Sequence, residues 1–195
     1  MSRKITEFHC IMPLGNIPSV LKHGILSHQR AAKLTHDSVA MEEVQDRRDL
    51  TQVPGGLKLH QYANLYFHAR NPMLYKRKDE AAELCVLQVS TEVRNLDGVV
   101  FADCNASSGY VRFRPPHRWS ELNLEAIFAR DWRHPDDPIA YLRHKSQKCA
   151  EILVPHCVEP QFITGAYVVN DAARARLQEL GFLLSVTIEP DLFFW

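Results

Sequence analysis

The sequence of 195 residues lacks the motifs by which common nucleotide and metal sites are recognised. It has only eight glycines, which form neither the G-x-G-x-x-G turn of a dinucleotide-binding βαβ unit nor the loop of a P-loop protein. The H-E-x-x-H pattern of zinc proteases and the G-x-S-x-G pattern of hydrolases are also absent. The five cysteines include no C-x-x-C pair and no zinc-ligand spacing. We therefore expect no metal site and no Rossmann-type or P-loop nucleotide site.

An excess of charge of one sign and long apolar runs are missing as well. Lys and Arg number 23, and Asp and Glu also number 23, so the chain has no overall basic surface for non-specific binding to duplex DNA. No apolar run approaches the roughly 20 residues that span a membrane, and the N-terminus carries no apolar signal segment. Together with an odd number of cysteines, these features predict a soluble, cytoplasmic protein with reduced thiols and no membrane partner.

Apolar runs and helical patterns are mixed along the chain and predict one domain, residues 1–195. The length and the apolar content of 46% are sufficient for a single core. The lack of a βαβ rhythm favours an α+β fold over a doubly wound sheet. Strands are expected at 8–12, 65–67, 84–89, 99–102, 151–154, 163–169 and 183–188. Helices are expected at 17–23, 41–48, 121–129, 139–145 and 171–180, and a short one begins at residue 72.

Two separated segments carry the clearest functional signals. In the first, the strand residues Tyr66 and Phe67 run into a helix that Asn71 caps and Pro72 begins. In the second, Glu151 stands at the start of an apolar strand, Ile-Leu-Val. A carboxylate at the start of a buried strand costs free energy unless it has partners or a function. Glu151 is therefore the first candidate for a catalytic carboxylate.

Four other residues have both a structural and a functional interpretation. His9 lies inside the first strand, where a core histidine bonded to a backbone carbonyl is the commoner case, and Asn16 is typical of a helix cap. Arg47 and Arg48 lie in a charged helical segment that would ordinarily face solvent. Because arginine is a bidentate donor that stays charged, either could instead clamp a diphosphate or a carboxylate. The functional interpretation gains weight if these residues line one pocket.

The segment 103–150 interleaves aromatic and basic side chains. Residues 104–150 hold eight Lys and Arg against five Asp and Glu, so the segment is locally positive. An unstacked base gains about 1–3 kcal/mol from stacking on an aromatic side chain, which makes the segment a candidate site for single-stranded nucleic acid. Phe128 and Tyr141 are expected in the core instead. The candidate contact residues are Tyr110, Arg114, Arg118 and, above all, Trp119, which follows a Pro-Pro pair.

Four pieces of the sequence, in this order, resemble the DarT-type ADP-ribosyltransferase toxins, which modify bases in DNA. The pieces are His9 with Asn-Ile-Pro-Ser-Val-Leu-Lys-His-Gly at 16–24, Val-Gln-Asp-Arg-Arg at 44–48, the block 62–75 with Asn-Pro-Met-Leu at 71–74, and Ala-Glu-Ile-Leu-Val at 150–154. The Tyr-Phe-x-x-Arg-x-Pro-Met-Leu pattern within the block is fairly specific. The ordered set covers most of the chain.

The resemblance implies a fold, a reaction and a partner. The fold is the α+β ADP-ribosyltransferase fold, with two packed antiparallel or mixed β-sheets around an NAD cleft and with peripheral helices. The reaction transfers ADP-ribose from NAD, without a metal, to thymine or guanine of single-stranded DNA and releases nicotinamide. The partner is a macrodomain antitoxin of the DarG type that removes the modification.

The resemblance also implies roles for individual residues. The segment 103–150 corresponds to the substrate-recognition loop. Where this chain reads Ala-Asn-Leu-Tyr-Phe at 63–67, some members read Pro-Phe-Tyr-Phe, and this departure leaves the modified base open. The implied catalytic residues are Glu151 and Arg48, with Arg47 as the alternative one position away, and the implied NAD-binding residues are His9, Asn16, Tyr66, Phe67 and Met73.

Three other functions are weighed against this one. An enzyme that removes a 2′-phosphate from RNA with NAD would need a basic phosphate pocket with paired His and Arg, and none is evident. A protein-modifying transferase would leave Trp119 without a nucleic-acid role. A non-catalytic nucleic-acid-binding module would bind without NAD, and Glu151→Ala would change no chemistry in it.

Overall fold

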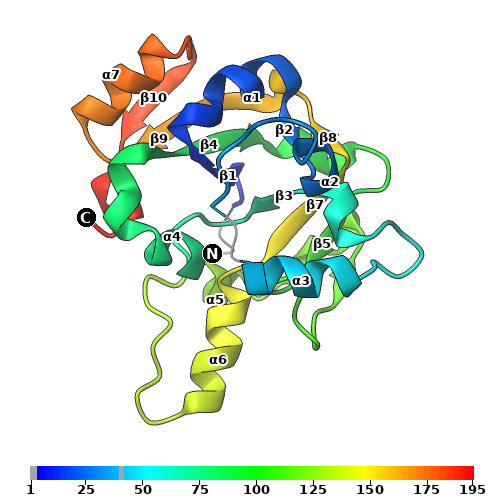
Figure 1. The fold of residues 1–195 in the computed structure, drawn as a ribbon. Helices are drawn as coiled ribbons and strands as arrows, with labels where there is room; N and C mark the ends of the chain where they lie inside the picture. Colours follow the sequence, from blue (N-terminus) through cyan, green and yellow to red (C-terminus); the bar gives the residue numbers. More distant parts are fainter. Residues whose placement is uncertain (1–3, 40–41) are drawn as a thin grey trace.

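The computed structural model describes residues 4–39 and 42–195, and within them it shows an α+β fold built on one large sheet (Figure 1). The sheet has the strand order β10-β9-β4-β1-β3-β7-β5-β6, and β2 and β8 form a small second sheet. The strands of the large sheet are β1 (Glu7–Pro13), β3 (Tyr62–Tyr66), β4 (Leu84–Ser90), β5 (Val100–Ala102), β6 (Phe113–Arg114), β7 (Glu151–Pro155), β9 (Ile163–Val168) and β10 (Ser185–Ile188). Those of the small sheet are β2 (Ile25–Leu26) and β8 (Cys157–Val158). The predicted α+β class is confirmed.

Helices flank the large sheet and project from it, with α6 standing away from the body of the molecule (Figure 1). The α-helices are α1 (Ile17–His23), α2 (His28–Ala31), α3 (Glu42–Leu50), α4 (Pro72–Lys76), α5 (Leu124–Phe128), α6 (Pro138–Gln147) and α7 (Asp171–Glu179). The 3-10 helices are η1 (Leu14–Asn16), η2 (Leu59–Gln61), η3 (Lys78–Glu83), η4 (Thr91–Asn95), η5 (Pro116–Glu121), η6 (Pro160–Phe162) and η7 (Pro190–Phe193).

Most predicted helices are present, and the differences have local causes. The helix expected at 121–129 begins only at Leu124, because Leu122 is extended and the side chain of Asn123 accepts a hydrogen bond from the Ala126 N–H. The helix expected at 41–48 is α3, although Met41 lies outside the described residues. One βαβ unit does occur, since α7 connects the parallel strands β9 and β10.

The large sheet is held together at its centre by a single residue pair. β1 pairs with β4 along its whole length, from Glu7 to Pro13, but it pairs with β3 only where His9 meets Tyr66. Beyond this pair the two strands diverge. The expected arrangement of two sheets around a cleft therefore takes the form of one sheet that opens between β1 and β3, with the small sheet beside it.

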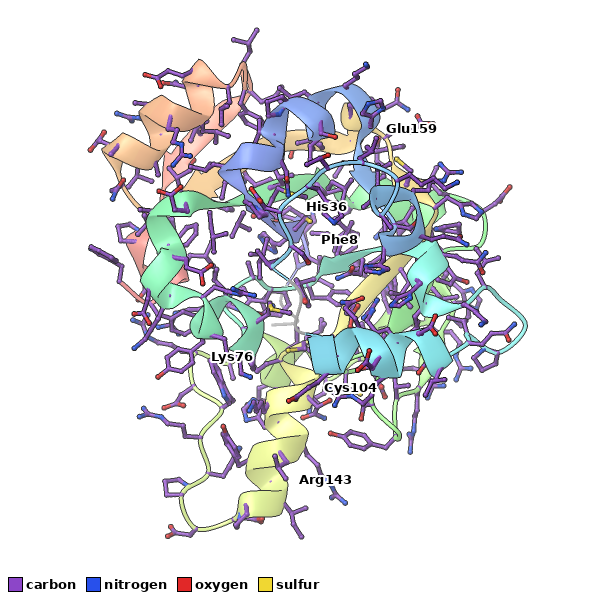
Figure 2. The ribbon with its side chains drawn as sticks, in the orientation of Figure 1. Phe8, His36, Lys76, Cys104, Arg143 and Glu159 are labelled. Atoms are coloured by element: carbon purple, nitrogen blue, oxygen red, sulfur yellow. The ribbon has the colours of Figure 1, made fainter. Side chains whose placement is uncertain are left out.

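The core contains a cluster of three aromatic rings. Phe8, Phe67 and Phe101 pack edge to face, with ring centroids 5.3–6.3 Å apart. Phe8 lies near the centre of the molecule, whereas Arg143 lies on the outer part of α6 (Figure 2). Gly24 ends α1 with a φ of +77°, and a Cβ there would lie 2.2 Å from the Val158 carbonyl oxygen. Only glycine fits this approach of α1 to the small sheet.

Candidate active site

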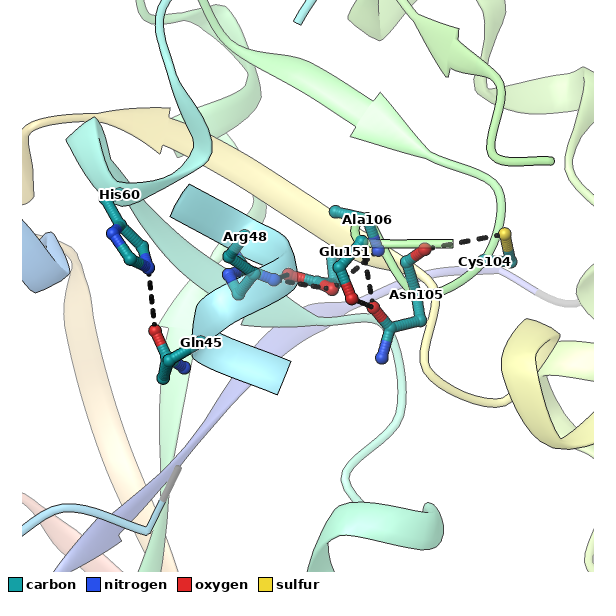
Figure 3. Close-up of polar contacts among 8 residues, drawn as sticks. Gln45, Arg48, His60, Cys104, Asn105, Ala106 and Glu151 are labelled. Atoms are coloured by element: carbon teal, nitrogen blue, oxygen red, sulfur yellow. Dashed lines mark hydrogen bonds and ion pairs between the residues drawn. The ribbon is translucent and has the colours of Figure 1, made fainter. Parts of the chain in front are cut away.

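Glu151 is a buried carboxylate with defined hydrogen-bond partners. It is the first residue of β7 and pairs with Tyr66 on β3 and with Ala102 on β5. The Ala106 N–H donates to its Oε1 at 2.9 Å, and Nη1 of Arg48 donates to both carboxylate oxygens, at 3.1 and 3.0 Å (Figure 3). The partners of this carboxylate are therefore a guanidinium and a backbone amide, which fix its orientation.

The two candidate arginines occupy different environments. Arg48 is buried on α3 and reaches Glu151, which is 103 residues away in the sequence. Arg47 is exposed, although it lies at the edge of the same cavity. Successive residues on a helix point about 100° apart, so only one of the two can meet the carboxylate. The geometry selects Arg48.

A cavity of about 650 Å³ opens in front of Glu151 and lies within the size range of small-molecule sites. It is bordered by the diverging ends of β1 and β3, by α3, α4 and α6, and by the segments 31–39 and 105–109. The blue segment between α2 and α3 arcs across β1 in the view of Figure 1, and His36 lies on it (Figure 2). The predicted site residues that line this cavity are Asn16, Arg47, Arg48, Tyr66, Met73 and Glu151.

Tyr66 and Met73 approach the cavity from the segment that the sequence singled out. The side chain of Asn71 accepts hydrogen bonds from the N–H groups of Met73 and Leu74, and Pro72 takes the first helical position, as predicted. Burial, with the neighbouring Glu151 carboxylate, raises the pKa of the Tyr66 hydroxyl well above its usual value. Tyr66 is thus a neutral phenol that offers the cavity a polar group and an aromatic face.

Asn16 has a different structural role from the predicted one. It occupies the N-cap position of α1, but its side chain makes no capping hydrogen bond, because Pro18 has removed one of the N–H groups that such a cap would use. Its amide instead donates to the Asp37 carbonyl at 2.7 Å and accepts from the Asp37 N–H at 3.0 Å. Asn16 therefore ties the segment 31–39 to the start of α1 beside the cavity.

His9 and Phe67 are not among the residues that line the cavity. The His9 ring is buried, and its Nε2 lies 3.1 Å from the Glu7 carboxylate. Phe67 is fully buried in the aromatic core. The residues of β1 that line the cavity are Cys10, Ile11, Met12 and Pro13, and burial raises the pKa of the Cys10 thiol to about 12. The sequence carries no signal for these positions, because the alternation of side chains along a strand does not show where the strand separates from its neighbour.

The four residues predicted to contact nucleic acid lie outside the cavity. Arg114 and Arg118 both pair with Glu121, and the guanidinium of Arg94 lies 4.7 Å from the centre of the Trp119 ring. Trp119 packs partly against the core. Tyr110, by contrast, is exposed and directly follows the cavity-lining segment 105–109.

The backbone amide that bonds Glu151 and the turn that carries it were not predicted from the sequence. The Ala106 N–H that bonds Glu151 belongs to a loop in which the Asn105 side chain accepts from both the N–H and the hydroxyl of Ser107. Asn-x-Ser is a turn-forming pattern, so the loop had a weak signal, but its contact with Glu151 had none. Over residues 4–39 and 42–195, no group of three His, Cys, Asp or Glu side chains is arranged to hold a metal ion. No helix in the same ranges has the length and apolar character needed to cross a membrane.

Comparisons with known proteins agree on one family. The sequence model described as "ssDNA thymidine ADP-ribosyltransferase, DarT" matches residues 9–194. A DNA ADP-ribosyl transferase–DNA ADP-ribosyl glycohydrolase fusion protein of Thermosipho africanus (strain H17ap60334) is 29% identical over 208 residues, which cover 100% of this chain and 50% of the fusion protein. A DNA ADP-ribosyl transferase of Thermus sp. (strain 2.9) is 32% identical over 162 residues, covering 76% of this chain and 74% of that protein. The chain thus spans about half the length of the first of these relatives.

Solved structures of the Thermus sp. 2.9 protein share the fold. Its complex with ADP-ribosylated ssDNA superimposes with a TM-score of 0.83 at 25% identity, covering 98% of this chain and 99% of the other. Its complex with NAD+ gives a TM-score of 0.78 at 23% identity, with the same coverage of 98% and 99%. The expected ADP-ribosyltransferase fold is therefore confirmed.

Proposed function

The chain belongs to the DarT family of ssDNA thymidine ADP-ribosyltransferases, and on this premise we propose that it transfers ADP-ribose from NAD to a base of single-stranded DNA and releases nicotinamide. The observation that carries the proposal is the buried carboxylate of Glu151, fixed by Arg48 and by the Ala106 N–H at the wall of a 650 Å³ cavity. NAD is a substrate here, and the cavity is large and polar enough at its base to receive its nicotinamide ribose.

Glu151 is the proposed catalytic residue. Cleavage of the bond between nicotinamide and ribose leaves an anomeric carbon with oxocarbenium-like positive charge. A fixed carboxylate next to the ribose hydroxyls stabilises this developing charge without reorganising during the reaction. A carboxylate free to rotate would lose part of this effect, and the two donors to Glu151 restrict such rotation.

Arg48 is the proposed orienting residue at the reaction centre. Its guanidinium donates to both oxygens of Glu151. When the new bond forms between the anomeric carbon and a nitrogen of the base, that nitrogen must lose its proton. The candidate acceptors of this proton are Arg48, Glu151 and water, and the role proposed for Arg48 is to orient and to stabilise charge.

The remaining cavity residues are proposed to hold NAD. Tyr66 and Met73 offer an aromatic face and a polarizable thioether to the nicotinamide end. Asn16 acts through the segment 31–39, which it anchors over the cavity. His9 and Phe67 do not line the cavity, and we propose that they support NAD binding indirectly. His9 pairs with Tyr66 across the two strands, and Phe67 packs in the core beside Phe8.

The proposed acceptor is an unstacked base, because a base within a duplex cannot reach an enclosed carboxylate. Tyr110 is the best placed of the four DNA-contact candidates, since it is exposed at the end of the cavity-lining segment 105–109. Arg114, Arg118 and Trp119 lie further out, around η5, and would contact the strand beyond the modified base. The family description names thymidine, so thymine is the first base to test and guanine the second.

Mass spectrometry of DNA oligonucleotides tests the proposal. Single-stranded oligonucleotides that contain only one kind of reactive base are incubated with the protein and NAD, next to duplex DNA, RNA and a protein mixture. We expect an ADP-ribose adduct on the thymine-containing or guanine-containing strands, no adduct on the duplex, and no adduct with Glu151→Gln. Glu121→Gln, which removes an exposed carboxylate, is the matched control and should retain activity. An adduct on RNA or protein alone, or undiminished activity in Glu151→Gln, would overturn the proposal.

A partner that reverses the modification is part of the same proposal. In the Thermosipho relative, the transferase name is joined with that of a DNA ADP-ribosyl glycohydrolase. We expect a macrodomain with this activity to remove the adduct from oligonucleotides modified by this chain, and to relieve growth arrest when both are expressed in one cell. An adduct that resists such a macrodomain would separate this chain from the toxin–antitoxin arrangement.

A further inference from the structure

α3 carries Arg48 to the active site but has almost no apolar anchorage of its own. Its sequence, Glu-Glu-Val-Gln-Asp-Arg-Arg-Asp-Leu, is charged, and Arg48 is the only buried residue among positions 43–50. Leu50 is 87% exposed, so the helix does not use its leucine for packing. Since most helices in proteins are held by an apolar face, α3 must be held in place by polar contacts.

The side chain of His60 supplies two of these polar contacts. Its Nε2 lies 3.0 Å from Oε1 of Gln45, and its Nδ1 lies 3.4 Å from Oδ1 of Asp49 (Figure 3 shows the contact with Gln45). Gln45 and Asp49 are four residues apart and therefore share one face of α3, one helical turn from each other. One imidazole ring thus spans the turn that contains Arg48.

His60 is itself fixed to the central sheet. It lies in η2, which leads directly into β3, the strand of Tyr66. Its neighbour Leu59 is fully buried, and the Leu59 N–H donates to the Thr51 carbonyl just after α3. The imidazole of His28 on α2 stacks on the His60 ring with centroids 4.3 Å apart and an angle of 31°. The ring therefore has little freedom to follow a displaced helix.

We infer that His60 is a positioning residue for Arg48. It fixes the position and rotation of α3 so that the Arg48 guanidinium reaches both oxygens of Glu151. It also connects α3 to β3, the strand that carries Tyr66. The inference rests on the proposed function, because it assigns His60 an effect on the reaction through Arg48. His60 lines a second, polar cavity of about 640 Å³ together with His28 and Asp49, so it acts from outside the active site.

Kinetics of paired variants test the inference. In His60→Ala, loss of the contacts to α3 lets Arg48 shift, and misplacement of about 1 Å can cost up to about 100-fold in rate. We expect kcat to fall by roughly 10-fold to 100-fold while the KM for NAD changes less than about 3-fold. His60→Gln keeps an amide near the former Nε2 and should recover most of the rate. His28→Ala removes the ring that stacks on His60 but leaves the two contacts from His60 to α3, and it should lower kcat less than His60→Ala does.

A double-variant cycle separates positioning from a general loss of stability. If His60 acts through Arg48, His60→Ala will have little further effect on kcat in an Arg48→Lys background. An equal loss of kcat in both backgrounds would overturn the inference. So would an increase in KM that parallels the fall in melting temperature across the variants.

Amide hydrogen exchange tests the inference without a measurement of activity. Backbone amides of residues 44–50 should exchange faster in His60→Ala than in the parent chain, while those of β3 and β7 should keep their protection. Unchanged exchange in α3 would refute the positioning role even if the enzyme is active. A parent chain that makes no adduct would refute the proposed function alone, and the exchange result would still stand.

Discussion

Two arginine–glutamate contacts of equal length differ in how far their side chains are exposed to water. Arg48 Nη1 lies 3.0 Å from Glu151 Oε2, and Arg114 Nε lies 3.0 Å from Glu121 Oε2. The side chains of the first pair are 7% and 2% exposed, and those of the second are 24% and 37% exposed. Water already stabilises the second pair's charges, whereas the first pair's charges depend on each other. Burial, and not distance, distinguishes Glu151 from Glu121.

The largest expected effect comes from breaking each pair in turn. Glu151→Gln leaves the Arg48 charge buried without a counter-charge and should lower the free energy of unfolding by about 3 kcal/mol or more. Glu121→Gln should leave it unchanged within error, because its partners remain in water. Urea denaturation at pH 7 measures both. The double variant Glu151→Gln/Arg48→Met leaves neither charge of this pair buried and should recover most of the lost stability. Equal losses in Glu151→Gln and Glu121→Gln would contradict the expected difference between the buried and the exposed pair.

A second buried cation extends the comparison to the segment before Glu151. Lys148 is fully buried, and its ammonium donates to the carbonyls of Ile127 and Ala129 at 2.9 and 2.7 Å and lies 3.1 Å from Nδ1 of His68. Lys148→Met should lower the free energy of unfolding by about 2 kcal/mol, because two buried carbonyls lose their donor. Thermal denaturation of this variant next to Arg143→Met, an exposed change on α6, tests it. No difference between the two variants would show that water replaces the ammonium.

The active-site pair could be predicted from sequence only in part. Glu151 carried a local signal, an acid at the start of an apolar strand, and the Asn71–Pro72 helix start is a local pattern as well. The choice of Arg48 over Arg47 required the rotation of α3, which His60 sets from outside the helix. Such polar contacts between distant segments leave no periodic pattern in a sequence.

The part of β1 that lines the cavity could not be predicted for a related reason. Residues 10–13 line the cavity from both faces of the strand, whereas His9 does not. Where the lining begins depends on the opening between β1 and β3 beyond the His9–Tyr66 pair, a property of the assembled sheet. The backbone N–H of Ala106 at Glu151 is a property of the loop and not of its alanine.

A smaller effect should distinguish the two aromatic residues on the nucleic-acid side. Tyr110 is 55% exposed beside the cavity, and its loss should weaken binding of single-stranded DNA by roughly 10-fold, the value of one stacked base. Trp119 is partly packed on the core under Arg94, so Trp119→Ala should lower stability more than binding. Fluorescence anisotropy with a labelled oligonucleotide, together with melting temperatures, separates the two. A stronger loss of DNA binding in Trp119→Ala than in the Tyr110 variant would show that the bound DNA passes over η5.

The smallest effect at neutral pH concerns Glu7, a carboxylate on β1 outside the cavity. Burial alone would raise the pKa of Glu7, but hydrogen bonds from His9, Tyr167 and Gln88 outweigh it and lower the pKa to about 2 from 4.5. Because the folded-state pKa is depressed, the stability from ionised Glu7 is fully present above about pH 4.5 and is lost as the pH falls towards 2.

Glu7→Gln should therefore lose less unfolding free energy than the parent chain between pH 4.5 and 2. Urea denaturation at a series of pH values measures this, and parallel curves would contradict it. Activity at pH 7 should stay within about 2-fold of the parent, in contrast with Glu151→Gln, because Glu7 bonds to His9 and not to a cavity-lining group. A raised KM for NAD in Glu7→Gln would instead mean that His9 reaches the dinucleotide, although it does not line the cavity.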